Sequence, residues 1–500
     1  MDQQHNQLCL KRLGIDTQEE FYVYVRQDCP VVRSEGFAAQ TRVVVRKDGV
    51  TIVASLNIIR SGILLPGEAS LSESAWLSLD AHEGDTLTLT HLPPLESFGH
   101  IRGKFYGKRF NKGAFQQIIR DVYEGNYSKV HTAAFISACA GDHLDLEEIT
   151  WLTEAMVEAG ERLDWGTDLI VDKHCVGGLP GNRTTPIVVS IVAAAGLTIP
   201  KTSSRAITSP AGTADTMETM TTVALSMERI REVVDQEGGC FVWGGAIELS
   251  PVDDLLIKVE RAMDIDSEGQ MVASVLSKKA AAGSRHVVID IPVGPTAKVR
   301  SHLEALKLKY FFSVVGMALG MHIEVVISDG SQPVGIGIGP ALEARDVLKV
   351  LRQAADAPQD LQAHALVLAA ALLELGGKAE RGDGMTLARQ LLQNGAAYRK
   401  FLAICEAQGG FHEPGQAAFT HEVHSKHRGE VVRINNRLLT KVAKLAGAPA
   451  DKTAGLECLV KVGDHLKRGD LLYRIHAESQ GELDYALSFV RAQENIIHLK

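Results

Sequence analysis

The sequence predicts a multidomain α/β protein in which a small helical domain accompanies a large α/β domain with a mostly parallel sheet. The chain has 500 residues, too many for one hydrophobic core, so about two to four domains are expected. Residues 167–250 and 284–410 alternate short β-branched strands with helices, a pattern typical of parallel sheets. Strand patterns at both ends add a β-rich N-terminal domain and a C-terminal α+β domain similar to a barrel-sandwich.

The β-rich N-terminal domain is expected over residues 1–95, where three runs alternate or carry β-branched side chains. They are residues 21–25 (FYVYV), 41–45 (TRVVV) and 86–90 (TLTLT). The following LPPL segment, 92–95, has the composition of a linker.

Amphipathic helices are predicted over residues 114–123 and 147–160, with acidic residues opening the second. Beyond them, β-branched runs at 169–171, 286–291 and 322–327 predict the strands of the parallel sheet. The expected domains are 1–95, 97–166 plus 252–283, 167–251 plus 284–412, and 420–500. In the last of these, two short strands around a Gly-Asp turn are expected.

Composition and charge exclude several classes of protein. A formal net charge of −9 argues against general nucleic-acid binding, which needs a basic surface. The N-terminus has no signal-peptide pattern, and the apolar runs fall short of the about 20 residues that a membrane helix needs. Seven cysteines without a C-x-x-C pair fit reduced thiols. We therefore expect a cytoplasmic protein that binds neither nucleic acid nor membrane.

Residues 172–218 contain the most informative pattern. Two loops rich in Gly, Ser and Thr flank an apolar segment, 186–200, and the first loop carries Lys173 beside His174. The second offers hydroxyls and a guanidinium, from Ser203, Ser204, Arg205, Thr208, Ser209 and Thr213. Backbone N–H groups, hydroxyls and cations together suit a phosphate. Either loop alone would be an ordinary turn, and Arg183 stands where a P-loop would need Lys.

Further polar residues have open interpretations. Ser274 and Lys278 share a helix face and either hold a polar ligand or form a solvated pair. Asp264 and Asp266 either serve acid–base chemistry or cap that helix. His421, His424 and His427 could bind a metal, but their spacing orders no site.

The same residues also carry a family resemblance. Residues 203–218 (SSRAITSPAGTADTME) closely resemble the signature of the thymidine/pyrimidine-nucleoside phosphorylase family, S-[GS]-R-[GA]-hydrophobic…G-T-x-D-x-hydrophobic-E. Residues 172–178 (DKHCVGG) resemble its phosphate loop, and residues 273–279 (ASVLSKK) its base-contacting helix. The chain length, the N-terminal domain and the P-G-N insertion at 180–182 resemble the long, type 2 branch, which includes archaeal AMP phosphorylases.

The resemblance implies a site for each part of the substrate. Phosphate would be held by Lys173, Thr185, Ser203 and Thr213, and the base by Ser274 and Lys278. Nucleotide-binding positions of the long branch match Gly178, Ser204, Arg205, Ala206, Ile207, Thr208, Ser209, Thr213, Ser274 and Lys298. The proton donor to the base would be Asp266 or His174.

The implied reaction is phosphorolysis of a nucleoside, thymidine plus phosphate giving thymine plus 2-deoxyribose 1-phosphate. A nucleoside 5′-monophosphate (AMP, CMP or UMP), yielding base and ribose 1,5-bisphosphate, is the alternative substrate. The resemblance implies no cofactor or metal, inorganic phosphate being a co-substrate, and a homodimer or larger homo-oligomer. Two departures from the family pattern are Cys175, where Ser is usual, and Val259, where the thymidine enzymes carry Arg. A magnesium-dependent phosphoribosyltransferase and a binding protein derived from a phosphorylase are the rival interpretations.

Overall fold

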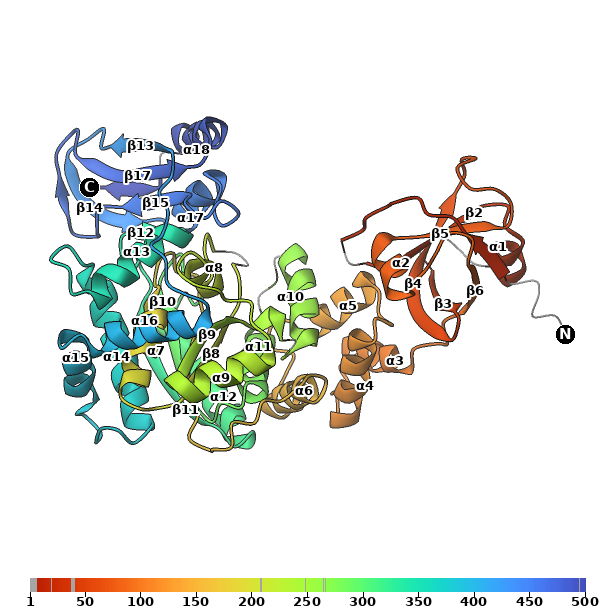
Figure 1. The fold of residues 1–500 in the computed structure, drawn as a ribbon, viewed down its shortest axis with the longest axis horizontal. Helices are drawn as coiled ribbons and strands as arrows, with labels where there is room; N and C mark the ends of the chain where they lie inside the picture. Colours follow the sequence, from red (N-terminus) through yellow and green to blue (C-terminus); the bar gives the residue numbers. More distant parts are fainter. Residues whose placement is uncertain are drawn as a thin grey trace. The chain divides into compact units, whose positions relative to one another are not determined.

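The computed structural model describes residues 7–500 except 19, 37–40, 207, 208, 248, 264, 266 and 494 (Figure 1). The chain forms two compact units. The first is Met1–Cys139 with Leu255–Asp264, and the second is Ala140–Asp254 with Ile265–Lys500.

The N-terminal part of the first unit is a closed β-barrel with the strand order β1-β5-β2-β4-β3-β6. Its strands are β1 (Gln7–Leu10), β2 (Tyr22–Arg26), β3 (Arg42–Lys47), β4 (Val50–Ile59), β5 (Glu68–Leu71) and β6 (Thr86–His91), with the short helices α1 (Pro30–Glu35) and α2 (Glu73–Ser78). Alternate residues of the strands, among them Val23, Val25, Val43 and Val45, fill the barrel core. The β-rich N-terminal part is thus confirmed.

Three helices follow the 92–95 segment in the first unit: α3 (Glu96–Phe105), α4 (Lys112–Tyr123) and α5 (Lys129–Cys139). α4 begins after Asn111, whose side chain accepts from the backbone N–H of Ala114. Its buried face, which includes Phe115, Ile118 and Ile119, gives it the amphipathic pattern that the sequence showed. Most of a later helix, α10 (Pro251–Met263), also belongs to this unit.

The second unit is built on five parallel strands. They are β7 (Val171–Cys175), β8 (Ile199–Ser203), β9 (Gly239–Trp243), β10 (His286–Val293) and β11 (His322–Asp329). β7 pairs with β10, which pairs with β11, and β8 pairs with β9. A parallel bridge from Ile170 to Thr198 joins the two groups, so the strand order is β11-β10-β7-β8-β9. The mostly parallel α/β domain is confirmed.

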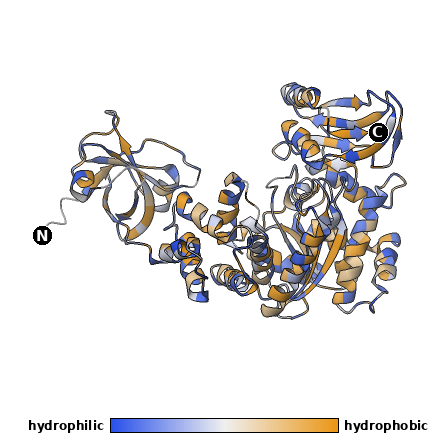
Figure 2. Cartoon of the chain, turned by 180° about the vertical axis from the view of Figure 1, so that it is seen from behind, coloured by the Kyte–Doolittle hydropathy of each residue, from blue (hydrophilic) through white to orange (hydrophobic). Residues whose placement is uncertain are grey.

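Helices surround this sheet (Figure 1). They are α6 (Leu146–Glu158), α7 (Thr184–Ala194), α8 (Thr213–Glu218), α9 (Met227–Glu237), α11 (Glu268–Ala281), α12 (His302–Ala318), α13 (Pro340–Leu351), α14 (Gln359–Leu375), α15 (Gly384–Gln393) and α16 (Ala396–Gln408), with a 3₁₀ turn, η2 (Gly244–Ala246). Residues 184–193 of α7 are all buried, because α14 and α16 pack against this helix. Hydrophobic stretches of the sheet are visible in Figure 2. In β10, Val287, Val288, Ile289 and Ile291 are fully buried, as expected of a strand covered on both faces.

The C-terminal part consists of two small sheets and two helices. One sheet has the order β12-β15-β17-β13 and the other β16-β14-β18. The elements are β12 (Gly337–Ile338), β13 (Phe419–His424), β14 (Gly429–Ile434), β15 (Gly455–Cys458), β16 (His465–Leu466), β17 (Leu471–Ala477), β18 (Ile497–Leu499), α17 (Asn436–Leu445) and α18 (Gln480–Ala492). β12 precedes α13 in the chain, so one strand of the four-stranded sheet comes from the α/β part.

The boundaries of two predicted elements are wrong. Lys173 and His174 are expected in a loop after a strand at 169–171, but both belong to β7. Ser203 likewise ends β8 rather than lying in the second loop. Polar side chains are typical of loops, which is why the sequence predicted loops here. In the structure, backbone pairing with β10 extends β7, and pairing with β9 extends β8. In the part of the chain that the structure describes, none of the helices combines the length and apolar character that crossing a bilayer requires.

Candidate active site

The two polar segments leave the sheet at the same edge. β7 and β8 are parallel neighbours, so their carboxyl ends lie side by side. Residues 176–183 follow β7 and lead into α7, and residues 204–212 follow β8 and lead into α8. Open α/β sheets bind ligands outside the carboxyl ends of their strands, which makes this edge the candidate active site.

Lys173 is the cation at the centre of this edge, although only 1% of its surface is exposed. Its ammonium group donates to Oγ1 of Thr184 at 2.8 Å and to Oγ1 of Thr185 at 3.3 Å, in the first turn of α7. A hydroxyl that accepts a hydrogen bond keeps its own hydrogen for donation. Thr185 can therefore donate to an anion at this helix N-terminus, where backbone N–H groups also point, whereas Thr184 is fully buried.

Arg183 connects the two segments. Its NH1 donates to Oγ1 of Thr213 at 2.6 Å and its NH2 to the carbonyl of Ala211 at 2.9 Å. Arg183 directly precedes Thr184, the partner of Lys173. A single phosphate site requires Lys173 and Thr213 to face it together, and this chain of contacts links the two residues.

Gly178 and Lys298 also come together. Gly178 has a φ of +82°, and a Cβ on it would lie 2.4 Å from the backbone nitrogen of Lys298. Both the left-handed backbone and the close approach require glycine here. The structure therefore brings a further lysine, from the segment after β10, to the loop that follows β7.

The segment after β8 is held by its own side chains. The Arg205 guanidinium pairs with Glu218 at 2.6 Å and lies over the Trp243 ring, 4.7 Å from its centroid. The Asp215 carboxylate accepts from the backbone N–H groups of Ala206 at 2.7 Å and Gly212 at 2.9 Å. Arg205 thus supports the loop, and the substrate contact that the family resemblance implies for it stays a prediction.

Hydroxyl groups of this segment differ in their availability. Oγ of Ser203 is buried without a hydrogen-bond partner among the described residues. Buried hydroxyls usually have a partner, so this hydroxyl is a candidate to bind a ligand. Ser209 donates to the carbonyl of Ala211 at 2.9 Å, whereas Ser204 is exposed. Ile207 and Thr208, two of the predicted substrate-binding residues, lie outside the described residues.

A buried ionic cluster supports Lys173 from behind. Asp172 is fully buried, and its carboxylate lies 2.5 Å from Nζ of Lys279 and 3.3 Å from Nζ of Lys201, both buried as well. Burial opposes the charge of Asp172, but the two lysines outweigh it and hold the pKa of this carboxyl below its ordinary value. Burial lowers the pKa of Lys279 to about 7 against the charge of Asp172, so the positive charge of the cluster is fully present only below that pH.

His174 is half-buried at the end of β7. Burial lowers the pKa of its imidazole well below the ordinary value, and the charges of the surrounding lysines, including Lys279 and Lys278, lower it further. The imidazole is therefore neutral near pH 7 and carries one N–H. It can donate a hydrogen bond, but it does not hold an acidic imidazolium proton.

Cys175, one of the two departures from the family pattern, is a thiol that favours its protonated form. Burial, together with the charge of Asp290, raises the pKa of this thiol to about 12. Asn182 lies against both groups, with Nδ2 at 3.5 Å from Sγ of Cys175 and 3.5 Å from Oδ2 of Asp290. Since the thiolate is the nucleophilic form, this description does not favour Cys175 as a nucleophile.

We therefore expect Cys175 to resist alkylation by iodoacetamide at pH 8 in the folded protein. The exposed Cys9 is the internal control, and the urea-unfolded chain shows that all seven cysteines can react. Peptide mapping by mass spectrometry should show Cys9 modified well before Cys175. Equal rates in the folded protein would contradict this description of the thiol.

Ser274 and Lys278 interact on one face of α11, as the spacing predicted. Nζ of Lys278 donates to Oγ of Ser274 at 3.1 Å and also pairs with the buried carboxylate of Asp253. The charge of Lys278 contributes to the lowered pKa of His174. Ser274 and Lys278 therefore lie near the end of β7. The two Asp residues that precede α11, Asp264 and Asp266, lie outside the described residues.

Other features are not part of this arrangement. Among the residues that the structure describes, no three His, Cys, Asp or Glu side chains gather in a way that could hold a metal ion. His424, from the predicted alternative, instead lies 3.0 Å from the carbonyl of Gly469 and 3.4 Å from Glu422.

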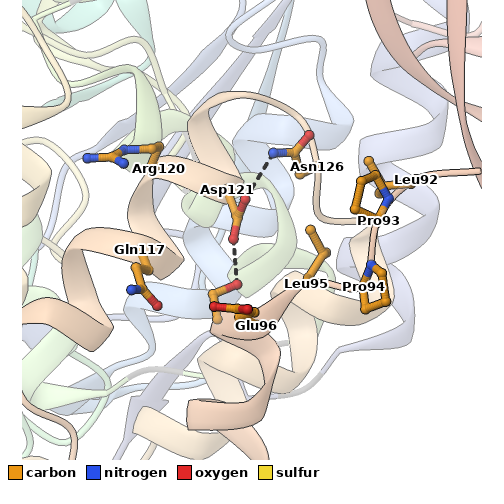
Figure 3. A pocket seen from close by; sticks show the side chains of 10 residues that line it. Leu92, Pro93, Pro94, Leu95, Glu96, Gln117, Arg120, Asp121 and Asn126 are labelled. Carbon is orange, nitrogen blue, oxygen red and sulfur yellow. Dashed lines mark hydrogen bonds between the residues drawn. The ribbon is translucent and has the colours of Figure 1, made fainter.

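Two cavities are lined by other residues. One, of about 260 Å³, is lined by the 92–95 segment and by residues of α4 (Figure 3). Asp121, on its wall, already accepts from Ser97 at 2.5 Å and from Asn126 at 2.9 Å. The other, of about 700 Å³, is lined by residues that precede β7, β10 and β11, at the amino edge of the sheet.

Several residues of the site escaped sequence reasoning. In the sequence, Arg183 was noted only because it stands where a P-loop would have lysine. Local patterns did not mark four further residues as candidates: Asp172, Lys201, Lys279 and Glu343. One signal was present: the strand at 171–175 carries three consecutive ionisable residues, which is unusual for a buried parallel strand. The partners of Asp172 and Arg183 include residues more than a hundred positions away in the chain, so local patterns do not reveal them.

Known proteins share this architecture. Residues 167–398 match the model of the glycosyl transferase family a/b domain, and residues 100–160 match its helical bundle domain. Residues 430–496 match the pyrimidine nucleoside phosphorylase C-terminal domain. The solved anthranilate phosphoribosyltransferase from Thermus thermophilus has a TM-score of 0.51 and 19% identity, over 62% of this chain and 98% of that one, a likeness of fold alone. Fold and family models together define a pentosyltransferase.

Full-length relatives narrow the class. A Hahella chejuensis protein named "Putative thymidine phosphorylase" is 54% identical over 495 residues, which cover 99% of this chain and 98% of that protein. Proteins of the same name from Polaromonas sp. and Legionella pneumophila are 55% and 54% identical, over 99% and 98% of this chain and 97% and 95% of theirs. The chain belongs to the thymidine/pyrimidine-nucleoside phosphorylase family, as the resemblance implied.

Proposed function

We propose that the protein catalyses phosphorolysis of thymidine, giving thymine and 2-deoxyribose 1-phosphate. The observation that carries this proposal is the pair of hydroxyls of Thr185 and Thr213, each of which accepts from a cation, Lys173 or Arg183. Each hydroxyl keeps its hydrogen for an anion. The names of the relatives from Hahella chejuensis and Polaromonas sp. support thymidine as the nucleoside.

In this proposal, phosphate binds at the N-terminal end of α7. Lys173, Thr185, Ser203 and Thr213 hold it, with Lys173 acting through the threonine hydroxyls and through its remaining N–H. The unpartnered Oγ of Ser203 supplies another donor. The base lies towards α11, where Ser274 and Lys278 contact it.

The chemistry asks little of the phosphate site beyond position. An oxygen of phosphate forms a bond to the anomeric carbon of the sugar as the bond from that carbon to the base nitrogen breaks. The electron pair of the broken bond leaves with the base, which takes up a proton, and positive charge builds on the sugar in between. Holding a dianion beside that carbon lowers the barrier by proximity and by charge.

The departing base needs a donor. His174, neutral near pH 7, can donate a hydrogen bond to it from its N–H, which stabilises the negative charge as the bond breaks, and the base then takes up its proton from water. Asp266 is the alternative donor, from the resemblance to the long branch.

A nucleoside 5′-monophosphate is the second candidate substrate, and one observation favours it. Lys298 lies against Gly178, in the loop that leads to α7, and a lysine there could bind a phosphate on the sugar. In addition, Val259 stands where the thymidine enzymes carry an arginine, so the protein lacks the contact that this arginine makes with thymine in those enzymes.

A substrate panel tests the proposal. The purified protein is incubated with inorganic phosphate and with thymidine, uridine, AMP, CMP or UMP, and the free base is measured by chromatography. We expect base release from thymidine that depends on phosphate. Release from the nucleotides alone would replace thymidine by the second candidate, and Lys298→Met would then raise KM for the nucleotide. A matched Lys349→Met variant, at a surface ion pair on α13, serves as the control.

A further inference from the structure

Arg183 is held in a buried position by three kinds of partner. Its Nε and NH2 lie 2.7 Å from Oε2 of Glu343, while NH1 and NH2 reach Thr213 and the carbonyl of Ala211. The side chain of Arg183 is 12% exposed and that of Glu343 is 1% exposed. The planar fork of a guanidinium fits such a set of fixed acceptors, which a lysine could not satisfy together.

Glu343 fixes this guanidinium from α13. Its Oε2 also accepts from Oγ1 of Thr216 at 3.4 Å, in α8, and its Oε1 accepts from the backbone N–H of Gly339 at 3.3 Å. Burial raises the pKa of this carboxyl to about 7, although the charge of Arg183 acts in the opposite direction. Arg183 and Glu343 therefore tie three elements together, the N-termini of α7, α8 and α13.

The contact with Thr213 has a chemical consequence. Oγ1 of Thr213 accepts from Arg183, and the structure shows no acceptor for the hydroxyl hydrogen among the described residues. The hydrogen therefore points away from Arg183. When Glu343 is ionised, its charge balances that of Arg183, so the direct attraction of the guanidinium for an anion is weak. Arg183 then affects an anion mainly by orienting the hydroxyl of Thr213.

We propose that Arg183 is a positioning residue for phosphate, which acts by fixing the hydroxyl of Thr213 as a donor. This inference rests on the proposed function, since it assumes that Thr213 contacts the phosphate. Glu343 contributes by holding Arg183, and neither residue needs to touch the anion.

A double-mutant cycle tests the inference. Arg183→Met, Thr213→Val and the double variant are compared with the wild type by two readouts: calorimetric binding of inorganic phosphate, and KM for phosphate beside KM for the nucleoside. Each single substitution should weaken phosphate binding by about 10–100-fold, the usual effect of losing a hydrogen bond to a charged group. KM for the nucleoside should change less than about twofold.

Phosphate binding by the double variant decides whether Arg183 acts through Thr213. If Arg183 acts through Thr213, the double variant binds phosphate no more weakly than Thr213→Val alone. Multiplied losses would overturn the inference, because Arg183 would then act on phosphate independently. Arg183→Lys keeps the charge beside Glu343 and should lose the same affinity; it replaces Arg183→Met if that variant does not fold. Arg389→Met, at an exposed arginine of α15, should leave phosphate binding unchanged.

The calorimetric arm separates this inference from the proposed function. Wild-type protein that binds phosphate but releases no base refutes phosphorolysis, and the cycle still decides the role of Arg183. Wild-type protein that binds no phosphate refutes both.

Discussion

Replacing Lys173 by methionine should lower kcat/KM by about 10²–10³-fold, the loss typical of removing one main donor from an anion site. The substitution removes the ammonium group that orients Thr184 and Thr185 and leaves a side chain of similar length. A buried charge costs free energy to desolvate, so its removal should leave the protein folded. Steady-state rates of base release, with circular dichroism of each variant, measure the effect.

Two further variants make this result interpretable. Thr185→Val should reproduce part of the loss by removing one hydroxyl that Lys173 orients. Lys349→Met, at a surface ion pair with Asp356, should retain full activity. A Lys173→Met protein that is folded and fully active would show that this lysine does not serve the phosphate.

The second large effect is on stability. Asp172→Asn should lower the free energy of unfolding by about 3–5 kcal/mol, the usual cost of breaking a buried ion pair by removing one partner. The amide leaves the side chains of Lys201 and Lys279 buried without a carboxylate. Urea denaturation at pH 7 measures the loss. Because the pKa of Asp172 lies below its ordinary value, the contribution of its carboxylate is present at pH 7 and is lost as pH falls through that pKa.

The matched control is Asp356→Asn, which removes an exposed carboxylate paired with Lys349 and should cost less than about 1 kcal/mol. Combining Asp172→Asn with Lys279→Met should recover part of the stability, since one uncompensated charge is removed. A loss from Asp172→Asn no larger than that from Asp356→Asn would mean that water reaches the cluster.

Local patterns sufficed for much of the fold. β-branched runs located the strands β10 and β11, and period-3.6 patterns located α4 and α6. The pairing of Ser274 with Lys278 followed from their spacing on one helix. These features depend on neighbours in sequence, which is why they could be predicted.

The site itself depends on contacts between distant residues. Arg183 meets Glu343, 160 positions further along the chain, and Asp172 meets Lys279, 107 positions further along. No periodicity encodes such pairs. For the same reason local patterns predict a loop for the polar residues of β7, since their partners, Thr184 for Lys173 and Lys279 for Asp172, compensate the cost of burial only in the folded chain.

The proposed reaction depends on orthophosphate being the attacking group. Phosphorus NMR of the purified protein with thymidine and inorganic phosphate tests this directly. We expect a new phosphomonoester resonance that grows in step with free thymine, and neither product when phosphate is omitted. Thymine released at the same rate without phosphate, or with no new phosphorus resonance, would contradict the proposal, because water and not phosphate would then be the nucleophile.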